Sequence, residues 1–104
     1  MKEYILCAAI WYKDFQLKTP IDSNTLPVNC DKGMVFCGYR HIQCMRSMTS
    51  ISGIWAKKDL IGEYEQGFLT SKNRFVDRIE GAKIAFDANQ INSQIHVLYS
   101  EDLY

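Results

Sequence analysis

The hydrophobic pattern of the chain opens with a run that is apolar on both of its alternating faces, YILCAAIWY at residues 4–12. Successive side chains of a strand point to opposite sides of a sheet, so such a run indicates a strand that is covered on both sides. We therefore predict residues 4–12 as the central strand of a sheet. A second, shorter strand, MVFCGYR, is predicted directly after Gly33.

A short helix is predicted after the second strand. It starts near Ile42 and ends at Gly53, and three apolar residues recur in it every three positions, which places them on one face: Met45, Met48 and Ile51. Arg40 and His41 then lie where the strand meets the helix.

The segment DRIEGAKIAFDANQ, which starts at Asp77, carries the clearest helical pattern. Asp77 is placed to accept hydrogen bonds from the free amides of the first turn, and Glu80 is placed to reach back, as in a capping box. Helical spacing predicts a buried face with Ala85 at its margin, made of Ile79, Ala82 and Phe86.

Alternating patterns return on both sides of this helix. Apolar pairs at 68–69 and 75–76 flank a polar tip at 70–73, which predicts a hairpin, and QIHVLYS at 94–100 predicts a last strand. Residues 54–66 mix a tryptophan with charges and stay unassigned. Together these elements indicate an α+β fold, a small and mostly antiparallel sheet of three to five strands with two helices packed on it. We expect a single domain, 1–104, because a chain of 104 residues is short for more than one core.

Charge and composition narrow the function classes. Twelve basic and twelve acidic side chains give no net charge, which argues against nucleic-acid polymers and membrane surfaces as partners. The first residues carry Glu3 beside Lys2 and do not resemble a signal peptide, and no apolar run approaches the roughly 20 residues that cross a bilayer. We expect a cytoplasmic protein with reduced thiols.

The stretch CGYRHIQC, residues 37–44, offers a thiol and an imidazole for metal or covalent chemistry. The chain's cysteines at 30, 37 and 44 lie seven residues apart, which is not the spacing of structural zinc sites, so we expect no metal. A thiol nucleophile would need a base and an orienting group placed by the fold, which this local arrangement does not indicate. We predict that the chain's four cysteines are small buried side chains.

Anion binding is the third interpretation of this stretch. Arg40 and His41 precede a helix whose free amides favour negative charge, and the planar guanidinium suits phosphate. Arg74 and Arg78 repeat the arrangement at the second helix, near three rings that a base could stack on: Tyr39, Phe68 and Phe75. Simple solvation of these arginines, and packing of these rings in the core, remain the alternatives.

These segments also resemble a known family. The Arg-His pair that enters a helix, the run QGFLTSKNRFVDRIEGAKIAFDANQI and the final LYSEDLY are similar to small phage and prophage proteins that include the Thoeris anti-defence sponges. The resemblance covers roughly half of the chain, without residues 13–32 and 52–64, and the two cysteines that flank GYRHIQ are not part of the family pattern.

The resemblance implies a non-enzymatic homo-oligomer, without a cofactor, in the cytoplasm of an infected bacterial host. This oligomer would sequester a TIR-made cyclic ADP-ribose signal, and by extension cyclic oligonucleotides, in pockets between subunits. The resemblance also implies which residues contact the ligand: Arg40, His41, Phe68, Arg74, Asp77 and Arg78. His41 and the acidic tail match the family pattern less directly. Two other classes stay open. One is a hydrolase of such a nucleotide that uses His41 with Asp77 or Asp102 as acid and base. The other is a phage accessory protein without a nucleotide ligand.

Overall fold

A four-stranded antiparallel sheet forms the centre of the computed structural model, which describes residues 2–17, 26–53 and 62–104. The strand order is β2-β1-β3-β4. The strands span Ile5–Tyr12 (β1), Met34–Gly38 (β2), Tyr64–Thr70 (β3) and Phe75–Asp77 (β4). With the two helices described next, this confirms the predicted α+β fold and the inner position of the first strand.

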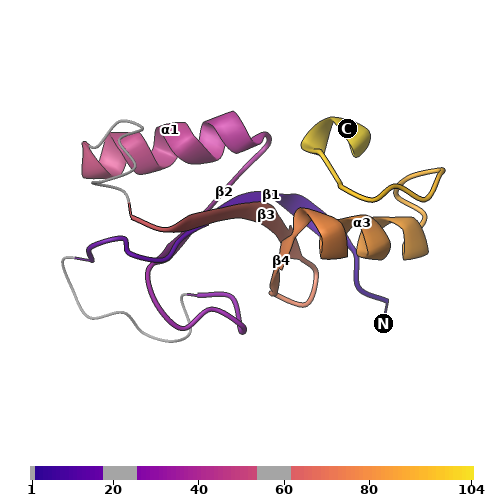
Figure 1. Ribbon diagram of the computed structural model, residues 1–104, viewed down its shortest axis with the longest axis horizontal. Helices are drawn as coiled ribbons and strands as arrows, with labels where there is room; N and C mark the ends of the chain where they lie inside the picture. The colour runs from indigo at the N-terminus through magenta and orange to yellow at the C-terminus, as the bar shows by residue number, and fades with distance from the viewer. Residues whose placement is uncertain (1, 18–25, 54–61) are drawn as a thin grey trace.

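Two α-helices pack on one face of this sheet. They are α1, His41–Ser52, and α3, Arg78–Asp87, and a single 3-10 turn, η2, spans Ser100–Asp102. Figure 1 shows α1 and α3 running away from each other along the long axis, so that their first turns face the middle of the molecule. The last residues of the chain lie above this middle region (Figure 1).

Both faces of β1 are buried, as its apolar run requires. Ala8, Ile10 and Tyr12 point into the core shared with the two helices, whereas Ala9 points into a second cluster with Leu26. The segment that includes Leu26 and Cys30 therefore covers the face of the sheet opposite the helices.

Helical spacing predicted only part of each buried face: Met48 in α1, and Ala82 with Ala85 in α3, are buried as predicted, whereas other predicted residues are not. In α1 the sheet side is formed by Cys44 and Met48, while Ile51 is 67% exposed. In α3 the buried residues are small, Gly81, Ala82 and Ala85, whereas Ile79 is 43% exposed and lines a surface hollow. Small residues are needed there because a β-carbon at Gly81 would already lie 3.1 Å from the ring of Phe68.

Local signals set several boundaries correctly. The hairpin of β3 and β4 has its tip at 71–74, where Asn73 adopts a left-handed conformation with φ 57°. The predicted strand at 94–100 was wrong, because this segment is irregular up to η2. Of the unassigned residues 54–66, residues 64–66 belong to β3 and 54–61 lie outside the described residues.

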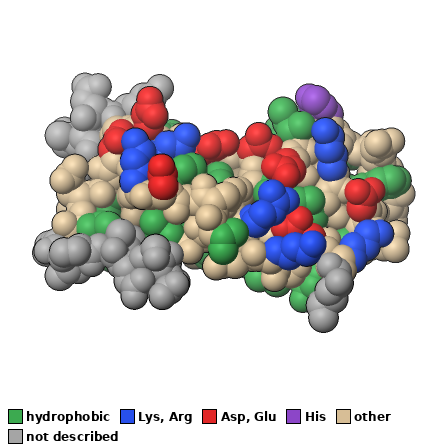
Figure 2. Space-filling model, turned by 90° about the horizontal axis from the view of Figure 1, so that it is seen from below, with side chains coloured by type: hydrophobic (Ala, Val, Ile, Leu, Met, Phe, Trp, Pro, Cys, Tyr) green, Lys and Arg blue, Asp and Glu red, His purple; other side chains and the backbone are tan. Residues whose placement is uncertain are grey.

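The surface carries charges of both signs side by side. On the face shown in Figure 2, Lys and Arg side chains are interspersed with Asp and Glu, and no large region of one sign is visible. Within the described residues, no helix is long and apolar enough to cross a membrane. A charged ligand would therefore be met by a few local groups rather than by a broad electrostatic field.

Candidate functional site

Arg40 stands at the start of α1, where it precedes the first helical residue. Its extended backbone donates its N–H to Oε1 of Gln43 at 2.6 Å, and its guanidinium lies over the rings of Tyr39 and Tyr104, 4.7 and 5.1 Å from their centroids. Nη2 donates to the backbone oxygen of Tyr104. Nη1 is buried and has no hydrogen-bond partner among the residues that the structure describes.

Arg78 is the first residue of α3, one position further into its helix than Arg40 is in α1. Its Nη2 donates to Oε1 of Gln66 at 2.6 Å, its Nη1 donates to the carbonyl of Leu98 at 3.1 Å, and its guanidinium lies over the ring of Tyr99 at 4.9 Å. The backbone N–H of Leu98 in turn donates to the carbonyl of Arg78 at 3.0 Å. The last segment of the chain is thus attached to the start of α3 by backbone and side chain together.

His41 is the first residue of α1 and joins the start of this helix to strand β3. Its Nε2 lies 2.8 Å from the carbonyl oxygen of Gly67, and its ring meets the edge of Phe68 with centroids 5.3 Å apart. Burial is the main cause that lowers the pKa of His41, and the positive charge of Arg78 lowers it further, while Gly67 and Glu101 act in the opposite direction. His41 therefore senses the charge at the start of α3.

We call Arg40, His41 and Arg78 the Arg-His-Arg cluster. The first turns of α1 and α3 face the same middle region (Figure 1), and each helix start carries partial positive charge on its free amides. Adding two permanent cations to two helix starts favours a bound anion, and a guanidinium prefers the planar oxygens of carboxylate or phosphate.

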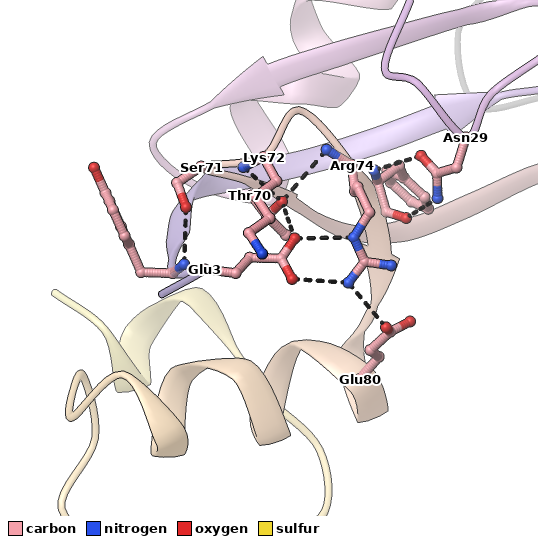
Figure 3. Close-up of polar contacts among 9 residues, drawn as sticks. Glu3, Asn29, Thr70, Ser71, Lys72, Arg74 and Glu80 are labelled. Carbon is pink, nitrogen blue, oxygen red and sulfur yellow. Dashed lines mark hydrogen bonds and ion pairs between the residues drawn. The ribbon is translucent and has the colours of Figure 1, made fainter. Parts of the chain in front are cut away.

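Arg74 does not share this environment, although it lies only four residues before Arg78. Its Nε and Nη2 each donate to the carboxylate of Glu3 at 2.9 Å, and Nη2 also donates to Glu80 at 3.1 Å (Figure 3). The hydroxyl of Thr70 donates to the same Glu3 carboxylate at 2.5 Å. These contacts lower the pKa of Glu3 to about 2, so the charge of Arg74 is already matched inside the protein.

Asp77 and Phe68 also have structural partners. Oδ1 of Asp77 accepts the backbone N–H of Glu80 at 2.8 Å, which confirms the predicted helix cap, but the Glu80 carboxylate turns to Arg74 instead of reaching back. Phe68 is 0% exposed and offers no face for a base. Of the three rings named from the sequence, only Tyr39 is largely exposed, at 58%.

The cysteines divide into two pairs. Cys30 and Cys44 are buried as predicted, and the Cys44 thiol points to the carbonyls of Ala8 and Arg40. Cys37 is exposed and Cys7 is partly exposed, so the prediction that all four are buried was wrong. In the part of the chain that the structure describes, no three His, Cys, Asp or Glu side chains gather to hold a metal ion.

A family model described as Phage T4 y16D protein matches residues 4–104. The chain belongs to this family. No curated protein and no solved structure matches it. The family description indicates a phage protein and names no ligand, so the chemistry of this y16D family member is argued from the Arg-His-Arg cluster.

Sequence reasoning missed the partners that complete the cluster. Gln66 accepts a hydrogen bond from Arg78, and Tyr99 and Tyr104 provide exposed rings beside the two arginines. The sequence signal for the two tyrosines is the tyrosine-rich ending LYSEDLY, whose pattern predicts a strand followed by an acidic tail.

Proposed function

We propose that this phage protein binds a TIR-made cyclic ADP-ribose signal at the Arg-His-Arg cluster and sequesters it without cleaving it, as an anti-defence sponge. The observation that carries the proposal is the position of Arg40. Its Nη1 is a buried cationic donor without a partner among the described residues. Such a donor is costly unless an acceptor reaches it, and a pyrophosphate oxygen is a strong acceptor of suitable geometry.

Arg78 supports a ligand that carries two phosphates. It starts the second helix that faces the same region, and its charge acts on His41, which directly follows Arg40. One arginine for each phosphate, with helix amides behind both, is a common chemistry of pyrophosphate binding. Arg74 is left out of the proposed set because Glu3 and Glu80 already neutralise it.

The adenine of such a ligand needs an aromatic partner, and the exposed tyrosines supply it. Tyr39, Tyr99 and Tyr104 are 58%, 53% and 40% exposed, and each lies against one of the two cluster arginines. A base that stacks on one of these rings would have its phosphates close to a guanidinium. These rings replace Phe68 in the proposed site.

The hydrolase alternative is less well supported by the contacts of its acid and base candidates. Nε2 of His41 is held by the carbonyl of Gly67, and Asp77 is engaged in the cap of α3. Asp102 accepts the backbone N–H of Tyr99 at 2.9 Å. Each group therefore has a structural partner in the place where an acid–base catalyst would need a substrate proton.

We further propose that the sponge acts as a homo-oligomer. The cluster lies among partly exposed side chains, and a second subunit placed over it would enclose the ligand and remove it from water. Light scattering of the purified protein, with and without ligand, tests this statement. A monomer at micromolar concentration with ligand bound would contradict it.

The function is tested by titrating cyclic ADP-ribose isomers into the protein and then identifying what heat releases. A sponge should return the intact nucleotide in stoichiometric amount, whereas a hydrolase should return linear ADP-ribose. Ligand at 100 times its dissociation constant should also stabilise the fold by about 2.7 kcal/mol. Linear ADP-ribose and a cyclic dinucleotide serve as comparison ligands. If none of these nucleotides releases binding heat or stabilises the fold, the sponge proposal is wrong, and the protein belongs to the class of accessory proteins without a nucleotide ligand.

A further inference from the structure

Cys7 and Cys37 lie together on one face of the sheet, opposite the face that carries the helices. In the pairing of β1 with β2, Ala9 is opposite Cys37 and Ala8 is opposite Gly38. Cys7 is two residues from Ala9 and so points to the same side as Cys37, as its diagonal neighbour on the adjacent strand. Both thiols are free.

This pair is accessible, unlike the other two cysteines. Cys37 is exposed and Cys7 partly exposed, while Cys30 and Cys44 are buried. The strand β2 is also the end member of the described sheet, so its outer edge is not covered by another described strand. A small oxidant can therefore reach the thiols of Cys7 and Cys37 more easily than those of Cys30 and Cys44.

The two thiols affect each other's ionisation, and they are chemically unequal. The neighbouring Cys37 thiol, with help from the backbone of Gly38 and against the effect of burial, lowers the pKa of Cys7 to about 7. The neighbouring Cys7 thiol, and then burial, raise the pKa of Cys37, so that Cys37 keeps its proton at neutral pH. Burial raises the pKa of Cys30 and Cys44 to about 11. A thiolate next to a protonated thiol is the arrangement of a reactive cysteine with its resolving partner.

We propose that Cys7 and Cys37 form an oxidation-sensitive dithiol, in which Cys7 reacts with peroxide and Cys37 closes an intramolecular disulfide. This inference goes beyond the proposed function and does not depend on it, because the Arg-His-Arg cluster contains no thiol.

The steps balance with hydrogen peroxide as the oxidant. The Cys7 thiolate attacks one peroxide oxygen, the O–O bond breaks, and Cys7 becomes a sulfenic acid while hydroxide leaves. This hydroxide takes the proton of Cys37 and becomes the first water. The Cys37 sulfur then attacks the Cys7 sulfur, the S–O bond breaks, and a second hydroxide leaves. That hydroxide and the proton released when Cys7 ionised give the second water. Overall, two thiols are oxidised by two electrons and one peroxide is reduced to two waters.

The test uses the wild-type protein, treated with hydrogen peroxide, unfolded, alkylated and mapped by mass spectrometry. We expect loss of two hydrogens, a cross-link between the peptides of Cys7 and Cys37, and alkylation of Cys30 and Cys44 only. The buried control variant Cys30→Ser should still form the bridge. Alkylation of all four thiols, a bridge between two copies of the chain, or a bridge between any other pair would overturn the proposal.

Two matched variants test the division of roles. In Cys37→Ser the sulfenic acid of Cys7 should accumulate and be trapped by a 1,3-dione reagent, because its resolving thiol is missing. The pH at which Cys7 alkylates at half its maximal rate should rise in Cys37→Ala, which removes the hydrogen-bond donor, and rise less in Cys37→Ser, which retains a hydroxyl. If the two variants share the wild-type profile, Cys37 does not activate Cys7. Circular dichroism shows that each variant is folded.

Discussion

The side-chain amide of Gln90 hydrogen-bonds both backbone groups of Ile5, accepting the N–H at 2.7 Å and donating to the carbonyl at 2.9 Å. Ile5 precedes the part of β1 that pairs with β2, so its edge of the strand has no neighbour in the described sheet. Asn29 does the same for Phe75 on the outer edge of β4, with hydrogen bonds of 2.8 and 2.6 Å. Two side-chain amides thus complete the ladder where strands end, which also protects these edges against pairing with other chains.

The first prediction follows from this contact. Gln90→Ala leaves the N–H and carbonyl of Ile5 without partners at a residue that is 3% exposed. The free energy of unfolding should fall by about 2–6 kcal/mol, since each of the two unsatisfied buried groups costs about 1–3 kcal/mol. Urea denaturation measures it, and the exposed Gln94→Ala is the control, expected within about 0.5 kcal/mol of wild type. Equal stability of the two variants would show that water replaces the amide.

The second prediction concerns Gly67, whose carbonyl accepts the contact from His41. A β-carbon at this position would lie 2.0 Å from the carbonyl oxygen of Val76 on β4. Gly67→Ala should therefore push β3 and β4 apart and cost more than about 3 kcal/mol, beyond the usual range for a single substitution. Thermal unfolding measures the change.

Gly53 provides the matched control for this steric effect. It ends α1 at φ 73°, and a β-carbon added there would have no neighbouring atom within 4 Å. Gly53→Ala should cost only about 1 kcal/mol, because the strain is confined to the left-handed backbone. A cost at Gly67 no larger than this would contradict the close approach of the two strands.

The third prediction is a pH dependence from the ion pair of Glu3 with Arg74. The pKa of Glu3 is lowered from 4.5 to about 2, so the folded protein holds this carboxylate ionised where the unfolded chain protonates it. The stabilisation is complete above pH 4.5 and is lost as the pH falls toward 2. Its size should be about 1–2 kcal/mol, because Arg74 is 34% exposed and water screens part of the attraction.

Glu3→Gln should flatten this part of the stability curve, measured by thermal unfolding between pH 2 and pH 6. The more exposed pair of Lys13 and Glu65, 3.5 Å apart, is the comparison, and Glu65→Gln should leave the curve close to that of wild type. A Glu3→Gln protein with the full acid sensitivity of wild type would place the effect in other carboxylates.

The fourth prediction concerns the Arg-His-Arg cluster and rests on the proposed function. Arg40→Ala and Arg78→Ala should each weaken binding of cyclic ADP-ribose by about 2–5 kcal/mol if the contacts are desolvated. Arg40→Lys should also weaken it, because an ammonium cannot present the planar pair of donors. Calorimetric titration measures the effect.

Two other arginines serve as controls for this prediction, one on α1 and one in the ion pairs with Glu3 and Glu80. Arg46, an exposed arginine of α1, should be replaceable by Ala without loss of binding, and so should Arg74 at some cost in stability. Circular dichroism checks that each variant is folded. Wild-type affinity in folded Arg40→Ala and Arg78→Ala proteins would show that both arginines serve only to hold the last segment of the chain.

Several elements could be predicted because they depend only on neighbouring residues. The apolar run of β1, the cap at Asp77 and the stop at Gly53 are confirmed, and the hairpin tip lies at 71–74, one residue beyond the predicted 70–73. Each is a local event, because alternation, a left-handed turn residue and a helix cap involve groups only a few positions apart. The placement of Arg40 and Arg78 at two helix starts follows from the same local rules.

The contacts between distant residues, in contrast, could not be predicted from local patterns. Arg74 and Arg78 look equivalent in SKNRFVDR, yet one pairs with Glu3, 71 residues away, and the other holds Leu98 and Gln66. The exposure of Cys37, and the irregular path of residues 94–99, were likewise set by packing between distant segments. Periodicity predicts which side chains of an element are buried, but the residues that they contact depend on the fold as a whole.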